Sequence, residues 1–188
     1  MRENYSCPFL LLQVLLVSRT LKSGHSRGLQ VSLVAATACC ALPWQFSQFV
    51  LFTQTLSLFG SYSLSFLPQD QLSPLLDCVF IGYSLSALCQ FLNTMLISSM
   101  YVSAYLAFKT VLLLNKSGKL SSRVLQFVRD VVVFVVVAGV YKSGSAWLLQ
   151  HTDDAHIFNI LRSKFTAYRD FDTMLYTCSK AVSYTHLT

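Results

Sequence analysis

The sequence predicts an all-α polytopic membrane protein, from its composition, its hydropathy and its long uncharged runs. Of 188 residues, 54% are hydrophobic and only 12% are charged, whereas a soluble domain carries about 25% charged residues. The mean hydropathy is +0.53. This composition excludes a disordered chain, a collagen-like repeat and a nucleic-acid-binding domain. Catalysis by paired glutamates is excluded as well, since Glu3 is the only glutamate.

The first third of the chain predicts three membrane spans. The apolar run at 8–17 is part of a span and not a signal peptide, because it lacks a basic leader and a small-residue cleavage site. Residues 28–69 carry no charge, and a run of that length is too long for one span and enough for two. Pro43 cannot continue a helix that runs into it, so it divides the run into spans at 29–42 and 45–67.

A second uncharged run and a further apolar stretch follow. Residues 78–108 contain no charge and predict either one long helix or two spans, at 78–92 and 94–114, broken near Asn93. Residues 124–141 are apolar on every face, which is typical of a helix that is exposed to lipid or deeply buried.

Two charges interrupt the last predicted span. Arg129 and Asp130 are adjacent, so their side chains project about 100° apart on a helix and are not expected to form a face-to-face pair. Near a helix end they are expected to extend toward water. A functional role inside the membrane is the alternative.

The basic residues set the expected orientation. Loops rich in Lys and Arg stay in the cytosol, and such residues gather at 19–27 and at 116–123. Both loops are cytosolic only if an even number of spans separates them, which favours splitting the run 78–114 into two. Residues beyond 141 are then lumenal or extracellular. The glycosylation sequon at Asn115 falls in the cytosolic loop.

Residues 142–180 form a polar segment of different character. Apolar residues recur there at helical spacing within 157–165 and again within 171–178. This pattern predicts two short helices that bury their apolar faces against the membrane bundle.

The candidate functional residues of this segment are four aspartates and one histidine: Asp153, Asp154, His156, Asp170 and Asp172. Capping of the two short helices explains all four aspartates. Binding of a substrate is a second interpretation. Ligation of a divalent metal by carboxylates and imidazole is a third, although the pattern gives it little support.

Five blocks of the sequence, in order, carry a resemblance to a known family: residues 2–13, 42–54, 90–95, 153–165 and 169–178. The most specific are Leu-Pro-Trp-Gln-Phe at 42–46 and Asp-Asp-Ala-His-Ile at 153–157. The chain resembles the dumpy-nineteen-like protein C-mannosyltransferases over residues 2–180.

The resemblance implies a central slice of a GT-C-type transmembrane helix bundle, from a multi-pass enzyme of the endoplasmic reticulum membrane. Such enzymes move mannose from dolichyl-phosphate mannose to tryptophan in Trp-x-x-Trp segments of secretory polypeptides. Their catalytic carboxylate lies upstream of the matched region, and Glu3 does not match it. No catalytic residue, metal or cofactor is therefore expected in this chain, and the slice alone is expected to be inactive.

The candidate substrate-binding residues are Asp153, Asp154, His156 and Arg162, where Arg162 is a cation for the donor's phosphate. A non-catalytic membrane scaffold or a transporter-like bundle is the alternative function. Residues 181–188 depart from the family pattern and resemble translated sequencing-adapter read-through, so they are expected to be a non-native tail.

Overall fold

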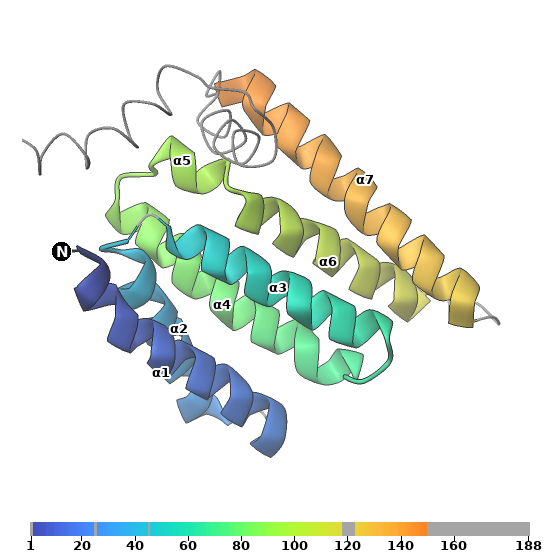
Figure 1. Ribbon diagram of the computed structural model, residues 1–188, viewed down its shortest axis with the longest axis horizontal. Coiled ribbons are helices and arrows are strands. Elements are labelled where there is room, and N and C mark those ends of the chain that lie inside the picture. Colours follow the sequence, from blue (N-terminus) through green and yellow to red (C-terminus); the bar gives the residue numbers. More distant parts are fainter. Residues whose placement is uncertain (1, 25, 45, 118–122, 150–188) are drawn as a thin grey trace, which may run out of the picture. The chain divides into compact units, whose positions relative to one another are not determined.

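A computed structural model describes residues 2–24, 26–44, 46–117 and 123–149. These residues form helices joined by short links, without a strand (Figure 1). The prediction of an all-α chain is therefore confirmed for the described part. The helices are Arg2–Ser23 (α1), Arg27–Ala41 (α2), Ser47–Ser63 (α3), Gln69–Cys89 (α4), Thr94–Ile97 (α5), Met100–Ser117 (α6) and Arg123–Leu149 (α7).

Three stretches in the described residues are long and apolar enough to cross a membrane: Gln69–Cys89, Thr94–Lys116 and Arg123–Ser145. Each contains at least 21 residues, and about 20 are needed to span the hydrocarbon core. The stretch from Arg123 to Ser145 has the highest hydropathy and only 11% of its window is buried, as expected for a helix that faces lipid.

The helices break near Pro43 and near Asn93. α2 ends at Ala41, and Pro43 lies in the turn that leads to α3. The run 78–114 is divided between α4 and α5, where Phe91 and Leu92 have positive φ angles of 55° and 56°. Since bulky residues rarely adopt this left-handed conformation, two in succession end α4 and redirect the chain.

Several helix ends differ from the predicted spans; α4, for example, begins at Gln69, ahead of the predicted start at residue 78. Two further differences lie in α1 and α7. α1 begins at Arg2, ahead of the predicted start at residue 8. α7 continues to Leu149, beyond the predicted end at residue 141, so the first residues assigned to the polar segment belong to this helix. In both cases the helix extends past the apolar residues that define a span.

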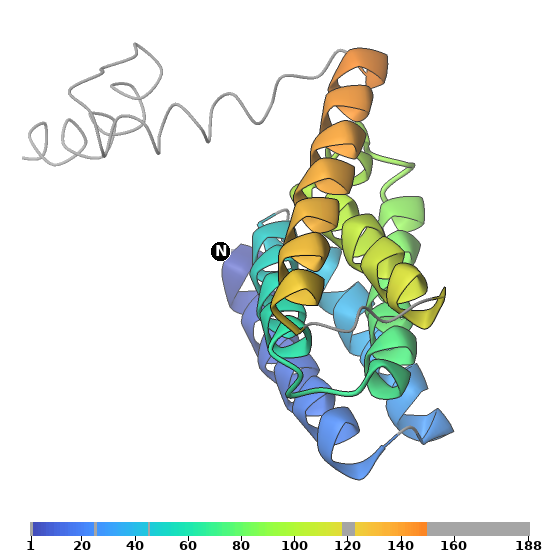
Figure 2. The same ribbon diagram turned by 90° about the vertical axis from the view of Figure 1, so that its right-hand side faces the viewer.

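Successive long helices run in opposite directions, and this brings three links to one end of the bundle (Figures 1 and 2). At that end, called here the Asn115 end, helices α1, α3 and α6 finish and helices α2, α4 and α7 begin. Of the basic residues in the two clusters, Arg19, Lys22, Arg27, Lys116 and Arg123 are described, and they lie at or near this end. This arrangement agrees with the even number of spans that the charge pattern requires.

Small residues allow α2 and α4 to approach closely. A Cβ added to Gly82 of α4 would lie 2.6 Å from the carbonyl oxygen of Val34 and 2.9 Å from Cβ of Thr37. One turn further on, Ser86 Oγ donates to the carbonyl oxygen of Ala38 over 3.0 Å. Small residues four apart, with a hydroxyl bond across the interface, are a common means of joining apolar helices.

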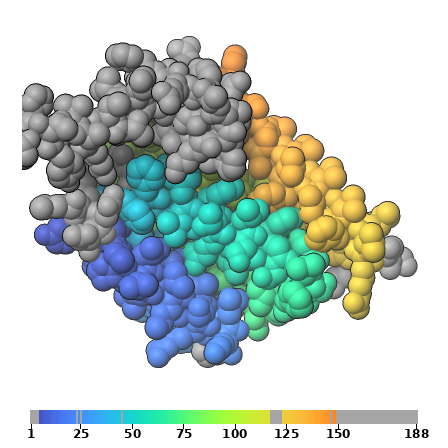
Figure 3. Space-filling model, in the orientation of Figure 1, coloured from blue at the N-terminus to red at the C-terminus, as the bar shows by residue number. Residues whose placement is uncertain are grey.

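Aromatic rings join α3, α6 and α7. Phe134 of α7 stacks on Phe59 of α3 with ring centroids 4.3 Å apart, and Phe108 of α6 meets Phe59 edge-on at 5.4 Å. In the space-filling view, side chains of α3 fill the face between α1 and α7 (Figure 3). These contacts hold both α6 and α7 against α3, beside the polar residues that lie between α6 and α7.

Candidate functional site: a buried polar network at the Asn115 end

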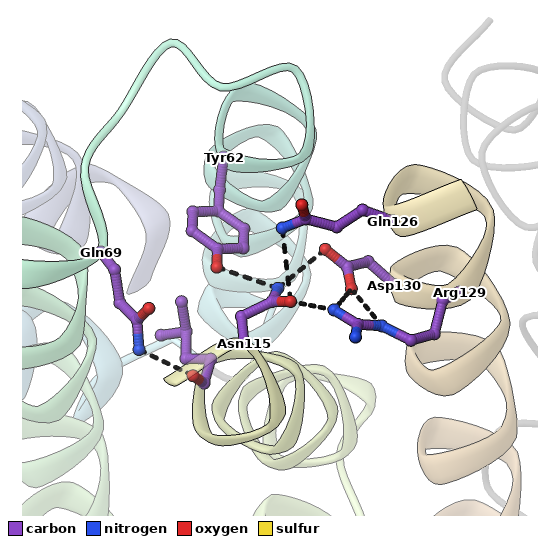
Figure 4. Close-up of polar contacts among 7 residues, drawn as sticks. Tyr62, Gln69, Asn115, Gln126, Arg129 and Asp130 are labelled. Carbon is purple, nitrogen blue, oxygen red and sulfur yellow. Dashed lines mark hydrogen bonds and ion pairs between the residues drawn. The ribbon is translucent and has the colours of Figure 1, made fainter. Parts of the chain in front are cut away.

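Asn115 and Asp130 meet between α6 and α7. Both residues are 2% exposed, although an amide and a carboxylate are ordinarily found near water. Asn115 Nδ2 donates to Asp130 Oδ2 over 2.8 Å and to the hydroxyl of Tyr62 on α3 over 3.0 Å (Figure 4). One side chain therefore connects three helices.

Arg129 completes the network. Its Nη2 lies 3.1 Å from Asp130 Oδ1 and forms an ion pair, and its Nε donates to the same oxygen over 3.3 Å. The prediction that these adjacent residues do not pair and extend toward water is wrong. The guanidinium lies on a long flexible stem that folds back to its neighbour, while Asp130 points inward to Asn115 (Figure 4).

All four hydrogen-bonding positions of the Asn115 amide are occupied. Its two N–H groups serve Asp130 and Tyr62, and its Oδ1 accepts from Arg129 Nη2 and, over 3.4 Å, from Gln126 Nε2. A buried carboxylate is tolerated only when it is paired and hydrogen-bonded, and both oxygens of Asp130 have partners. The buried polar atoms of Asn115 and Asp130 thus all have hydrogen-bond partners, and these bonds constrain the position of α7.

The sequence predicted that the sequon at Asn115 lies in a loop, but Asn115 lies in a helix. α6 continues through Asn115 to Ser117, which extends the helix past the predicted end at residue 114. A glycan would have to be attached to Nδ2, the atom that binds Asp130 and Tyr62. A glycan on Asn115 is therefore incompatible with the hydrogen bonds of the folded network.

A cavity of about 560 Å³ adjoins the network. The α3–α4 loop forms one wall, and the first two turns of α7 form the other. Its lining combines hydroxyl, amide and carboxylate groups with apolar side chains, contributed by Tyr62, Ser63, Leu64, Ser65, Phe66, Leu67, Pro68, Gln69, Arg123, Val124, Gln126, Phe127 and Asp130. Gln69 Nε2 donates to the carbonyl oxygen of Leu112 over 2.7 Å and so ties the loop to α6 (Figure 4).

The opposite end of α7 is fastened to α5 by its polar side chains. The hydroxyl of Tyr141 donates to the carbonyl oxygen of Ile97 over 2.9 Å, and Lys142 Nζ donates to that of Ser98 over 2.7 Å. From the other side, the hydroxyl of Tyr83 donates to the carbonyl oxygen of Leu96 over 3.0 Å. Carbonyls at the end of a helix have few partners within the helix. These three side chains supply hydrogen bonds to them, and the Leu96 carbonyl also accepts from the backbone N–H of Ser99 over 3.4 Å.

The sequence-predicted site residues Asp153, Asp154, His156 and Arg162 lie outside the described residues, as do Asp170, Asp172 and the tail at 181–188. Their roles stay predictions. Within the described part, no group of three His, Cys, Asp or Glu side chains could hold a metal ion.

Sequence reasoning overlooked the partnership of Asn115 with Asp130. The available signal was a carboxylate in an apolar stretch with an amide 15 residues earlier, across a short link between two helices.

These features define a helical membrane protein whose bundle is held together by buried polar contacts. Comparison with known proteins specifies the family. The family model described as "Dpy19: Q-cell neuroblast polarisation" matches residues 1–187. The chain therefore belongs to the Dpy19 family.

Two relatives have names that state an activity. Protein C-mannosyl-transferase DPY19L1 of Mus musculus is 38% identical over 186 residues, which cover 95% of this chain and 24% of the relative. C-mannosyltransferase dpy-19 of Caenorhabditis elegans is 33% identical over 183 residues, which cover 95% of this chain and 26% of the relative. The chain thus spans about a quarter of the length of these relatives.

Proposed function

We propose that the full-length protein is a C-mannosyltransferase of the endoplasmic reticulum membrane. It takes mannose from dolichyl-phosphate mannose and transfers it to tryptophan in Trp-x-x-Trp segments of secretory polypeptides. The observation that carries this proposal is the similarity of 95% of the chain to proteins named C-mannosyltransferases. The apolar helices support it, because an enzyme that uses a lipid-linked donor must work at a membrane.

In the proposed reaction the anomeric carbon of mannose forms a bond to a carbon of the indole ring. The bond between mannose and the donor's phosphate breaks, dolichyl phosphate leaves, and a base accepts the proton that the ring carbon loses. None of the described residues is assigned as that base. The catalytic carboxylate is expected in the part of the full-length protein that precedes this chain, so the 188-residue chain alone is inactive.

The described residues act in this proposal as a frame. The Asn115–Asp130 network holds α7 to α6 at one end, and Tyr141 with Lys142 hold it to α5 at the other. The segment with the candidate substrate-binding residues follows α7 in the sequence. In that segment, Asp153 and Asp154 hydrogen-bond hydroxyls of mannose or orient Arg162, which contacts the donor's phosphate through charge-assisted bonds.

The test is mannosyl transfer by the purified full-length protein. Dolichyl-phosphate mannose and a Trp-x-x-Trp peptide are supplied, and fragmentation of the product locates the added hexose. We expect one hexose linked by carbon to tryptophan. A matched peptide with phenylalanine in place of the accepting tryptophan should stay unmodified, and so should the first peptide with a nucleotide-linked mannose donor. A hexose on serine or threonine, or transfer from the nucleotide donor, would contradict the proposal.

A further inference from the structure

A second ion pair lies between α4 and α6, six residues before Asn115 along α6. Lys109 Nζ is 2.7 Å from Asp77 Oδ2 and donates to Ser73 Oγ over 2.9 Å. The hydroxyl of Tyr105 donates to Asp77 Oδ1 over 2.8 Å. The pair is thus supported by a side chain from each of the two helices.

The pair lies deep along α4. Asp77 is eight residues from Gln69 and twelve from Cys89, so at 1.5 Å per residue it lies about 12 Å from the first residue of α4 and about 18 Å from the last. The core of a bilayer is about 30 Å thick. A charge at this position of a spanning helix lies well inside the hydrocarbon region.

The pair is only partly covered by its own helices. The side chains are 40% exposed for Asp77 and 23% exposed for Lys109. The ammonium group has three hydrogens, of which Asp77 and Ser73 accept two. Ionisable side chains inside a membrane almost always face protein or water, because lipid offers them no hydrogen-bond partner.

The exposed face of α7 shows the contrast. Its exposed side chains along the same depth are valines, which suit lipid: Val128, Val132, Val135, Val136 and Val140. The exposed face of α4 instead continues from Asp77 to Ile81, one turn along, which is 55% exposed. A side chain four residues further on lies on the same face of a helix. One neighbouring helix could therefore cover the apolar residue and the ion pair together.

We propose that a transmembrane helix from the rest of the full-length polypeptide packs along this face of α4 and α6. At the level of Asp77 and Lys109 that helix carries a hydrogen-bonding side chain, which accepts from the ammonium group or donates to the carboxylate. The relatives supply the length that this requires, since this chain covers only 24% of one and 26% of the other. The inference concerns the assembly of the bundle and does not depend on the proposed activity.

Photo-crosslinking in the full-length protein tests this packing. A photoreactive phenylalanine analogue replaces Ile81 on α4 or, separately, Leu113, which is one turn from Lys109 on α6 and 66% exposed. The matched control carries the analogue at Val136 on α7, which is 56% exposed. The elution profile in detergent verifies for each variant that the full-length protein still folds with the analogue in place. Irradiation takes place in membranes, and mass spectrometry identifies the attached peptide.

From Ile81 and Leu113 we expect crosslinks within one polypeptide to a peptide outside the 188 residues. From Val136 we expect attachment to lipid. Three results would overturn the inference: attachment to lipid alone from Ile81 and Leu113, a crosslink to residues 150–188, or a crosslinked dimer that joins two copies of the protein. None of these readouts measures mannosyl transfer, so failure of this inference is distinguishable from failure of the proposed function.

Discussion

Asn115 Nδ2 lies 2.8 Å from Asp130 Oδ2, and this hydrogen bond joins the end of α6 to α7. Few other positions on α7 are buried, because its outer face is apolar and exposed. A lipid-facing helix gains little from apolar contacts with its neighbours, since lipid tails are as apolar as leucine. The polar network therefore helps to hold α7 in place, as the burial of apolar side chains does for a helix of a soluble protein.

Replacing Asp130 by alanine should lower the melting temperature of the protein, because it weakens the contact between α6 and α7. The change leaves Arg129 without its carboxylate and Asn115 without one acceptor, and breaking a buried ion pair costs about 3 kcal/mol. Thermal unfolding in detergent, followed by loss of the monodisperse elution peak, measures the effect. The matched control is Val132→Ala, at a 54% exposed position two residues away on α7. Equal melting temperatures for the two variants would show that the network does not stabilise the fold.

Gly82→Ala should destabilise the bundle by separating α2 from α4. The new methyl group would lie 2.6 Å from a backbone oxygen of α2, which cannot move without shifting the helix. Overpacking of this kind costs about 1–3 kcal/mol. Gly139→Ala on α7 is the control, because nothing lies within 4 Å of its added Cβ and alanine favours a helix over glycine by about 1 kcal/mol. A melting temperature for Gly82→Ala at or above that of Gly139→Ala would refute the close packing.

Part of the fold is predictable from the sequence, from different signals at different helix breaks. Proline and uncharged length divide 28–69, and the balance of basic loops divides 78–114. The site was less predictable. Adjacent residues leave a helix in directions about 100° apart, and this angle alone predicts that the side chains of Arg129 and Asp130 do not meet. Their arrangement depends on the reach of arginine and on Asn115, which the preceding helix α6 supplies where it packs against α7.

Asn115 should remain unglycosylated when the chain is translated into microsomes. The fold buries its amide nitrogen, and the charge pattern places this end of the bundle in the cytosol. A sequon engineered into residues 150–180, well away from the membrane, should be modified, because that segment is expected in the lumen. A shift in electrophoretic mobility that glycosidase reverses reports each result. A glycan on Asn115 would contradict both its burial and the orientation.

Mannosyl transfer distinguishes a substrate-binding role of Asp153, Asp154 and His156 from a role in helix capping. Asn and Ser cap helices about as well as Asp, so Asp153→Asn and Asp154→Ser preserve a cap that is worth about 1 kcal/mol. In the full-length protein these variants and His156→Gln should lower mannosyl transfer at least about tenfold, which corresponds to about 1.4 kcal/mol. The melting temperature should be unchanged. Full transfer with unchanged stability would show that the cluster is no binding site.

The central claim, that the full-length protein is a C-mannosyltransferase, is tested most directly in cells that lack this activity. The full-length protein is expressed there with a secreted reporter that contains a Trp-x-x-Trp segment, and mass spectrometry examines the reporter's tryptophans. The account predicts a carbon-linked hexose on tryptophan with the full-length protein and an unmodified reporter with the 188-residue chain alone. Unmodified tryptophan in the presence of folded, membrane-inserted full-length protein would contradict it.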